Sequence, residues 1–385
     1  MKHKALKQRF YPRDEQKLIL AQTFGCSRFV YNSILRWRTD AFYNDGESIN
    51  YLDASKKLTE IKKNPEFSWL NDVSSVPLQQ AIRNQQTAFK NFFEKRAEYP
   101  KFKKKTSRQS VQYMKSAYKW DGEKIKLAKM DAPLRIKWTY QKPKEILSLT
   151  ISMDSAGRYW VSMLVEFKPK ALPVSPKTIG VDLGIKDLIV CSDGFKSGST
   201  KLTKKYEGKL AYLQKQLTKK QKGSKRRLKM KRRVARVHAK IADKRRDSLH
   251  KLSRMLVNEN QVIAFEDLAV ANMKRNHKLS KAISDMGWSE FVRMTTYKAE
   301  WAGRDVVKIN RFYPSSKRMS CCGHVLDSLS LSQREVTCPV CDITHDRDIN
   351  ASINIKQAGL SELVGDTRYK SRGATGSGVV SNEVI

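Results

Sequence analysis

The sequence predicts an α+β protein of several domains, in which a β-rich part with a helical insert precedes an α/β part. Three observations lead to this class. Apolar residues first recur with a helical period and then alternate as in strands. Short apolar strands alternate with helical segments after residue 178. Two cysteine pairs interrupt the last part, and a length of 385 residues allows about two or three domains.

The N-terminal part combines one short strand with helices. Residues 4–11 form the expected strand. The apolar residues that follow recur at helical spacing, and Gly25 among them predicts a break between two helices. Ser75 is a suitable N-cap and Pro77 suits the first turn of the next helix. Residues 13–97 are therefore expected to form a small helical domain.

A change of period marks a β-rich domain. Apolar and polar residues alternate over residues 147–153, a turn follows at Ser155, and residues 159–167 return as a second strand. This pattern predicts a β-hairpin with one buried face. Together with the first strand, residues 1–12 and 98–172 are expected to form one β-rich domain.

The last part is expected to be an α/β domain. Strand signals lie in TIGVDLGIKDLIVCSDG, QVIAFEDL and DVVKINRFY, and DRDINASINIKQ predicts a helix. Residues 200–255 form a long basic helical region between the strands. The stretch 359–385 is rich in Gly, Ser and Thr without an apolar period, so a disordered tail is expected there.

The charge of the chain indicates a polyanionic partner. Lys and Arg number 76 against 38 Asp and Glu, which gives a net charge of +38. Nucleic acid is favoured over an anionic membrane surface, because the positive charge runs through the whole chain. No apolar run approaches the ~20 residues of a membrane span. The clustered cysteines and the missing secretory signal predict a reducing, cytoplasmic compartment.

Two basic stretches are candidates for contact with nucleic acid. Such residues neutralise phosphates and bind in a salt-sensitive, sequence-neutral way. Acidic residues that could pair with them along a helix are nearly absent from the second stretch. The candidates are Lys101, Lys103, Lys104, Lys105, and Lys225, Arg226, Arg227, Arg232, Arg233 and Arg236.

Carboxylates on apolar strands are conspicuous in so basic a chain. In Ile179–Gly184, alternation places Gly180, Asp182 and Gly184 on one face of a strand. A carboxylate between two glycines on the same face is expected to leave room for a bulky ligand or an ion.

Two further acidic segments complete a set. Glu266 ends the strand VIAFE, and Asp346 or Asp348 lies at a helix start. A buried group of carboxylates needs cations, and two Mg²⁺ ions about 3.5–4 Å apart would support in-line phosphodiester hydrolysis. Each acid alone could be a turn or cap residue, whereas all three in this order predict a catalytic site.

These motifs carry a family resemblance. GVDLGIK, FEDL and HDRDINASINI resemble the three acidic motifs of a RuvC-type nuclease domain with an RNase H-like fold. Nearly the whole chain resembles TnpB, a family of transposon-encoded RNA-guided DNA endonucleases related to type V CRISPR effectors. The resemblance implies Asp182, Glu266 and Asp348 as catalytic acids and Mg²⁺ ligands, with Asp346 as the alternative to the third. It further implies a guide RNA made from the transposon end and a short motif read in double-stranded target DNA.

The resemblance also gives the domains their expected identities. A β-rich wedge domain covers residues 1–12 and 98–172, and residues 13–97 form its helical recognition insert. A RuvC-like nuclease domain covers 173–312 and 345–358 and includes the basic helical region. A zinc-ribbon-like insert that binds target nucleic acid covers 313–344. The other family motifs are FYPRDEQKLILAQTFGCSRFVYN, YPKFKKKTSRQSVQY, NRFYPSSK and TCPVCDITHDRDINAS.

The cysteines of the insert predict a structural Zn²⁺ site. Cys338 and Cys341 form a C-x2-C knuckle, and Cys321 and Cys322 lie 16 or more residues before it. Zinc bound by these four thiols would fold the insert and steady the neighbouring helix of Asp348.

One departure from the family leaves this zinc site open. The first knuckle of the family reads C-x2-C-G, and Met319 stands here where its first Cys is expected. A thioether is a poor Zn²⁺ ligand beside thiolates. Either Cys321 takes the fourth position, or His324 or His345 does, or the site is weak or empty.

Three other functions remain open from the sequence. An unguided transposase, or an accessory protein of transposition, could use the same acids for strand transfer, and dependence on a guide would separate the two. A nuclease-inactive guided DNA-binding repressor should have lost acids, yet all three are present. A non-specific RNA-binding protein would have no need of the acidic set.

Overall fold

Two compact units make up the chain in the computed structural model, which describes residues 2–198, 202–330 and 333–365. The first unit runs to Lys168 and also contains Lys222–Arg236. The second unit contains Pro169–Gln221 and the residues from Val237 onward. The basic helical region, predicted to lie wholly in the nuclease domain, is thus divided between the two units.

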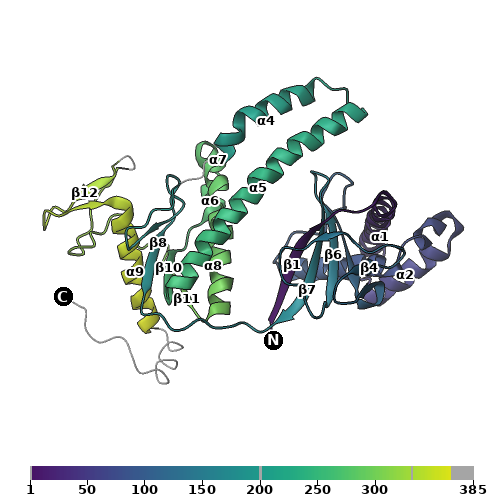
Figure 1. Ribbon diagram of the computed structural model, residues 1–385, viewed down its shortest axis with the longest axis horizontal. Helices are drawn as coiled ribbons and strands as arrows, with labels where there is room; N and C mark the ends of the chain where they lie inside the picture. The colour runs from purple at the N-terminus through teal and green to yellow at the C-terminus, as the bar shows by residue number, and fades with distance from the viewer. Residues whose placement is uncertain (1, 199–201, 331–332, 366–385) are drawn as a thin grey trace. The chain divides into compact units, whose positions relative to one another are not determined.

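An antiparallel five-stranded sheet is the centre of the first unit (Figure 1). Its strand order is β2-β6-β7-β1-β5. The predicted hairpin is present, since Met153 at the end of β6 pairs with Tyr159 at the start of β7. The strands are β1 (Lys2–Phe10), β2 (Gln109–Met114), β5 (Ile136–Lys137), β6 (Ser148–Met153) and β7 (Tyr159–Phe167), with a separate ribbon of β3 (Tyr118–Trp120) and β4 (Ile125–Leu127).

Three helices of the first unit pack together through their apolar faces. They are α1 (Asp14–Asp45), α2 (Tyr51–Lys63) and α3 (Ser75–Phe93), with 3-10 turns η1 (Pro65–Asn71) and η2 (Lys115–Ala117). The predicted break at Gly25 is wrong, because α1 is continuous. Buried Leu20, Phe24 and Val30 hold both sides of the glycine to the core, which outweighs its cost of about 1 kcal/mol in a helix. The N-cap of α3 is Ser74, one residue before the predicted Ser75.

A four-stranded sheet in the order β11-β10-β8-β9 is the centre of the second unit. Strands β8, β10 and β11 are parallel, and β9 is antiparallel to β8. The strands are β8 (Thr178–Asp182), β9 (Val190–Cys191), β10 (Val262–Glu266) and β11 (Asp305–Ile309), and the insert holds β12 (Glu335–Thr337) and β13 (Thr344–Asp346). The helices are α4 (Leu202–Thr218), α5 (Lys225–Glu259), α6 (Val270–Met273), α7 (His277–Met286), α8 (Trp288–Ala302) and α9 (Arg347–Gly365).

Helices cover both faces of this sheet (Figure 1). Side chains such as Val181 and Phe265 pack against the C-terminal half of α5 and against α8. The opposite face carries Ala264 and packs against α9. Both faces of β8 and β10 are therefore buried, which explains their nearly continuous apolar sequences.

The sequence predicts that Gly180 leaves room for a ligand, and this prediction is wrong. Gly180 instead allows helix α9 to pack closely on the strand. A Cβ at Gly180 would lie 2.1 Å from the backbone oxygen of Ser352 and 2.5 Å from the nitrogen of Lys356, both on α9. Gly184 is likewise closed, because a Cβ there would lie 2.8 Å from the oxygen of Asp187. The glycines bring α9 and a tight turn close to the strand, next to Asp182.

The C-terminal helix is longer than predicted. The disordered tail expected from residue 359 is wrong for residues 359–365, which continue α9 to Gly365. A Cβ at Gly359 would lie 2.6 Å from that of Ala264, so this glycine is a close-packing position and not a sign of disorder. The rest of the predicted tail, 366–385, lies outside the described residues. Within the described chain, no helix is long and apolar enough to cross a membrane.

Candidate functional site

Three carboxylates lie at one edge and on one side of the second unit's sheet. Asp182 is the last residue of β8 and Glu266 the last of β10. Because these strands are parallel, their carboxyl ends meet at the same edge. Alternation along each strand directs both acids to the face that α9 covers. Asp348 lies in the first turn of α9, so it approaches the same place from the helix.

Asp182 is the carboxyl group with the most perturbed electrostatics. Burial, together with the negative charges of Glu266 and Asp348, raises the pKa of Asp182 to about 7. The backbone amide of Leu183 and the charge of Arg347 offset this only in part. A bound cation would reduce both the cost of burying these carboxylates and the repulsion between their charges.

Glu266 is held by a serine from a distant loop. The Ser315 hydroxyl donates a hydrogen bond to Oε1 of Glu266. Burial raises the pKa of Glu266, and the bond from Ser315 opposes that rise. Ser315 itself is buried, so it holds one carboxylate oxygen of Glu266 from within the fold.

Two arginines neutralise Asp348. Arg347 donates from Nε and Nη2 to Oδ1 at 3.2 and 3.1 Å, and Arg334 donates from Nη1 to Oδ2 at 3.1 Å. The carboxylate is mostly buried, with 19% of the side chain exposed. The negative charge of Asp348 is therefore offset by two guanidinium groups.

Asp346 has a different task from Asp348. Its Oδ1 accepts the backbone amides of Asp348 and Ile349 at 3.1 and 3.0 Å, which caps α9. Its Oδ2 accepts from Lys196 Nζ at 2.6 Å. With both oxygens engaged, Asp346 is the cap and ion-pair partner, and Asp348 is the acid whose charge reaches Asp182.

A hollow of about 420 Å³ lies beside the acids within the second unit. Glu266 and Asp267 line it together with Trp288, Arg293 and Lys308. Trp288 is buried and donates from Nε1 to the oxygen of Gly184 at 3.3 Å, so it also holds the turn that follows Asp182. Of the three acids, Glu266 is among the residues that line this hollow, whereas Asp182 and Asp348 are not.

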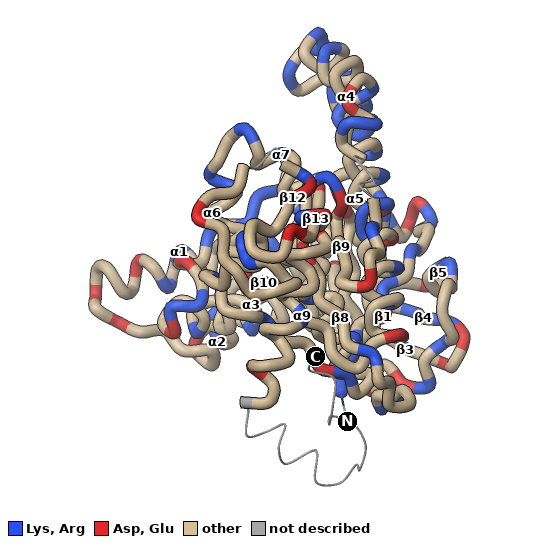
Figure 2. Tube along the Cα trace, turned by 90° about the vertical axis from the view of Figure 1, so that its left-hand side faces the viewer, with Lys and Arg blue, Asp and Glu red and all other residues tan. Residues whose placement is uncertain are grey.

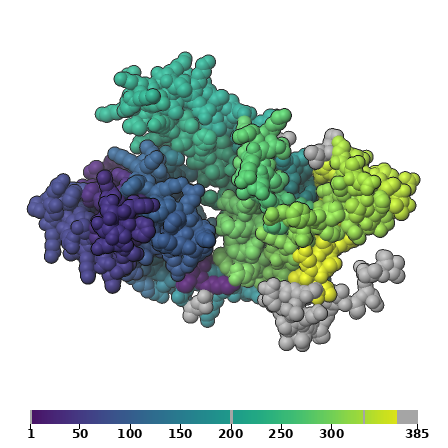
Figure 3. All heavy atoms as spheres, turned by 180° about the vertical axis from the view of Figure 1, so that it is seen from behind, coloured from purple at the N-terminus to yellow at the C-terminus, as the bar shows by residue number. Residues whose placement is uncertain are grey.

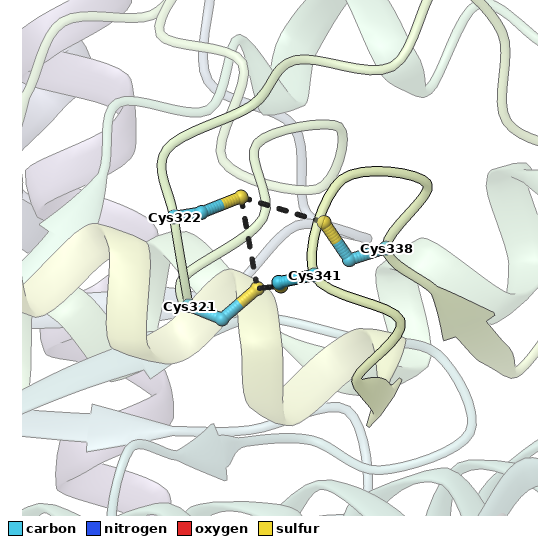
Figure 4. A group of neighbouring side chains, drawn as sticks. All are labelled: Cys321, Cys322, Cys338 and Cys341. Atoms are coloured by element: carbon cyan, nitrogen blue, oxygen red, sulfur yellow. Dashed lines mark hydrogen bonds between the residues drawn. The ribbon is translucent and has the colours of Figure 1, made fainter.

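The four cysteines of the insert converge on one point (Figure 4). Their sulfur atoms all lie within 4.8 Å of one another, and no other such group of potential metal ligands is present among residues 2–198, 202–330 and 333–365. The sulfurs of Cys322 and Cys338 are 3.4 Å apart, and those of Cys321 and Cys341 are 3.0 Å apart. Four thiols at this spacing match the donor set of a structural zinc site.

The surroundings of Cys338 lower the pKa of its thiol and so favour the thiolate. Burial alone would raise the pKa of its thiol. Hydrogen bonds from the backbone amides of Cys341 and Val340, and from neighbouring thiols, instead lower this pKa to about 6. Amides that point at the sulfur of a knuckle stabilise the charged form that binds metal.

Met319 is a core residue of the insert and not a ligand. Its side chain is 0% exposed and packs with Val336 and Cys338. Cys321 takes the fourth position instead, so a vicinal pair replaces the spaced knuckle of the family. In the described part of the chain neither His324 nor His345 joins the sulfur group.

The insert is hydrogen-bonded to α9, the helix that carries Asp348. Asn350 on α9 accepts from the backbone amide of Ser320 at 2.8 Å and donates to the oxygen of Arg318 at 2.7 Å. Asn354 donates to the oxygen of Ser315 at 2.9 Å. In the space-filling view the yellow-green insert adjoins the yellow helix (Figure 3).

The basic candidates are mostly exposed. Figure 2 shows Lys and Arg gathered along α4 and the first turns of α5. Among the candidates on α5, Arg227 alone is half-buried. In the other stretch, Lys103 lies 4.1 Å from the ring centre of Tyr31, and Lys101 pairs with Glu98. Lys104 and Lys105 are exposed.

Sequence reasoning missed the residues that hold the acids. Ser315 lies in the motif NRFYPSSK, but nothing in the sequence pairs it with Glu266, which is 49 positions away along the chain. Arg334 lies in an irregular part of the insert and likewise gives no signal. Arg347 could have been found, since it stands between two candidate acids at a helix start.

Three family descriptions match parts of the chain. Residues 162–277 match "Probable transposase", and residues 288–355 match "Cas12f1-like, TNB domain". Residues 1–47 match "Helix-turn-helix domain", although this segment consists of β1 and the single continuous helix α1 in the structure.

Two relatives match over nearly the whole chain. A Streptomyces pristinaespiralis protein named "Putative RNA-guided DNA endonuclease" is 47% identical over 361 residues, which cover 93% of this chain and 90% of that protein. InsQ of Escherichia coli (strain K12), which bears the same description, is 33% identical over 378 residues, or 93% of each chain. A TnpB-like protein of Acanthamoeba polyphaga mimivirus, L79, is 26% identical over 57% of this chain and 45% of its own length.

A solved structure shares the fold. The Cas12f1 chain of a cryo-EM complex with sgRNA and target DNA superposes with a TM-score of 0.55 at 13% sequence identity. The match covers 92% of this chain and 98% of that one. Both the N-terminal β and helical parts and the C-terminal α/β part therefore follow an arrangement of elements seen before.

Proposed function

Because this chain belongs to the TnpB family, we propose that it is an RNA-guided DNA endonuclease of an insertion sequence. It cleaves target DNA next to a short motif, with sequence read by pairing between guide and target. The observation that supports this function best is the set of three acids that β8, β10 and α9 bring to one side of the sheet. The second unit then corresponds to a RuvC-like nuclease domain with an RNase H-like fold.

The acids are the candidate ligands of divalent cations. Asp182, Glu266 and Asp348 offer the carboxylate oxygens that Mg²⁺ prefers, and burial together with the charges of the other two acids raises the pKa of Asp182. A pair of Mg²⁺ ions would supply the charge that activates water and stabilises the leaving oxygen. The chain's own groups position these acids: Ser315 orients Glu266, and Arg334 and Arg347 orient Asp348.

A structural zinc belongs to the same proposal. Cys321, Cys322, Cys338 and Cys341 would hold one Zn²⁺ as thiolates. Because the insert is bonded to α9 through Asn350, zinc steadies the helix that carries Asp348. Loss of zinc would then impair cleavage without any change to the acids.

The partners follow from charge and family. A guide RNA made from the transposon end and double-stranded target DNA both suit a net charge of +38. The exposed basic residues of α5 and the segment around Lys104 contact phosphates, and the guide carries the sequence information.

Two rival functions make different predictions. The description "Probable transposase" favours strand transfer without a guide, for which the same acids would serve. A nuclease-inactive guided repressor would bind its target without cutting, yet the chain retains all three acids. Guide dependence separates the first rival, and cleavage separates the second.

The experiment begins with the RNA that co-purifies when the protein is expressed together with its flanking DNA. One discrete species that ends at the element's boundary is expected, and it then programmes the protein against a plasmid. Asp182→Ala should abolish cutting and keep RNA and DNA binding, because it removes a metal ligand and no phosphate contact. A smear of bulk RNA would favour the unguided rivals, and wild-type cutting by Asp182→Ala would refute the assignment of the acids.

A further inference from the structure

The loop that follows β11 presents one aromatic ring to solvent beside the acids. Phe312 is 89% exposed, the highest value of any large aromatic side chain in the described residues. Its neighbour Tyr313 instead packs against Ala264, Ile309 and Ile355. Outward and inward rings on successive residues indicate that the exposed ring is not a part of the core.

This loop is rigid and not a loose surface segment. The side chain of Asn310 accepts the backbone amide of Phe312 at 2.8 Å, and its backbone oxygen accepts that of Tyr313 at 3.1 Å. Arg311 Nε donates to the backbone oxygen of Asp267 at 3.0 Å, and its guanidinium also pairs with that side chain. The ring of Phe312 is therefore held on a fixed base.

The same loop is bonded to the candidate catalytic acid. Ser315, which hydrogen-bonds Glu266, follows Phe312 by three residues. Three residues span at most about 11 Å between Cα atoms, which is about the length of three stacked nucleotides. Asp267, to which Arg311 is tied, lines the hollow next to Glu266. A strand whose phosphate lies at the acids therefore has this ring within a reach of about three nucleotides.

The charge around the loop suits a nucleic-acid strand. Lys308, Arg311 and Lys317 carry positive charge; Lys308 and Arg311 both pair with Asp267, and the carboxylate of Glu362 accepts the backbone amide of Asn310 at 3.1 Å. Lys317 donates to the backbone oxygen of Asp327 at 2.7 Å, a contact that leaves its charge uncompensated. An exposed ring among cations is the usual composition of a site that stacks single-stranded bases.

We infer that Phe312 is a stacking platform for an unpaired base of the DNA strand being cut, within a few nucleotides of the scissile phosphate. Stacking fixes the strand across the acids, so Phe312 is a positioning residue and takes no part in proton or phosphate chemistry. This inference rests on the proposed endonuclease function. It assigns a role to Phe312 of the motif NRFYPSSK, whereas Ser315 of the same motif holds Glu266.

The test uses the full chain with its guide RNA and target DNA. Phe312→Ala should lower the single-turnover cleavage rate by about 5- to 150-fold, the range that loss of one stacked base gives. Phe312→Trp should retain the rate. The melting temperature should not change, since the ring makes little contact with the fold. Tyr140→Ala, which removes another exposed ring from the first unit, is the control expected to cut at the wild-type rate.

A spectroscopic readout separates stacking from other roles. In the uncut complex of Asp182→Ala, 2-aminopurine is placed at each position around the mapped cut site. At one position, stacking on Phe312 is expected to quench the fluorescence of the 2-aminopurine. The double variant that combines Asp182→Ala with Phe312→Ala should restore this fluorescence. If wild-type protein cuts under guidance but Phe312→Ala changes neither rate nor fluorescence, the inference is wrong and the function stands. If wild-type protein shows no guided cutting, the proposed function itself fails.

Discussion

At the scale of single residues, the chemistry of the site depends on which oxygens are already occupied. Both oxygens of Asp346 are engaged, by two backbone amides of α9 and by Lys196. Asp348 is held only by guanidinium groups, which a cation can displace or join. Two acids at nearby positions in the chain thus differ: Asp346 caps the helix, and Asp348 is the one that the proposed function places in the reaction.

This difference predicts opposite outcomes for two isosteric variants. Asp346→Asn should keep cleavage within a few-fold of wild type, because Asn caps helices as well as Asp and the ion pair that it removes is worth about 0–1 kcal/mol. Asp348→Asn should lower the rate by more than the roughly 10–100-fold that removal of an outer partner costs. Rates of guided plasmid cleavage at saturating Mg²⁺ measure both. A larger loss for Asp346→Asn than for Asp348→Asn would reverse the assignment.

At the scale of elements, the sequence predicts strands better than it predicts what glycines do. The acids on β8 and β10 could be placed, because period-2 alternation decides the face of each residue. The uses of Gly25 and Gly180 could not, since each depends on distant partners: a core that holds α1 straight, and a helix that packs on β8. The same holds for Ser315, whose contact with Glu266 exists only after β10 and β11 pair.

The close approach of α9 to β8 makes Gly180 a stability position. A Cβ at Gly180 would lie 2.1 Å from the oxygen of Ser352, and backbone cannot move as a side chain can. Gly180→Ala should destabilise the protein by about 1–3 kcal/mol or more, as overpacked cores do. Gly208→Ala is the matched control, because a Cβ added to this exposed glycine of α4 would meet nothing within 4 Å. That change should stabilise the helix by about 0.5–1 kcal/mol.

Denaturant unfolding of the purified chain measures both glycine variants under the same conditions. A shift of α9 should also displace Asp348, so Gly180→Ala should lose guided cleavage even where it remains folded. Equal stability of the two variants would show that α9 does not pack on Gly180 as described.

In the insert, the four predicted sulfur ligands lie together and the open question of the fourth position is narrowed. With Met319 in the apolar core, Cys321 completes the sulfur group. If the wild-type chain binds one zinc ion as proposed, Cys321→Ser should lose it, whereas Met319→Leu should keep it because the core volume is conserved. Atomic absorption on purified protein gives the zinc content. Retention of zinc by Cys321→Ser, together with its loss in His324→Ala, would identify a histidine ligand instead.

At the scale of the whole molecule, the net charge of +38 favours the binding of nucleic acid but does not say where it binds. Total charge attracts any polyanion at long range, and ionic strength screens that attraction. Direct phosphate contacts differ, because each one releases counterions and adds to the salt dependence of binding. The slope of log affinity against log salt can therefore separate contacting cations from bystanders.

Exposed arginines on the first half of α5 are the expected contacts. Replacing Arg232, Arg233 and Arg236 by Gln should reduce that slope by about 0.7–0.9 for each phosphate that is no longer neutralised. The fall in affinity should be uniform across target sequences, since these residues read no bases. Titrations of the guide-bound protein with target duplex over a range of salt concentrations give the slope.

A control of equal charge decides whether position matters. Lys17, Lys57 and Lys251 are each paired with an acid three or four residues away on the same helix, at 2.7, 3.0 and 2.8 Å. Replacing these three by Gln removes the same formal charge but no expected phosphate contact, so the slope should stay near the wild-type value. If both triple variants lower the slope equally, the protein binds through its overall field, and the assignment of contacts to α5 is wrong. If only the arginine variant does so, α5 lies on the path of the nucleic acid.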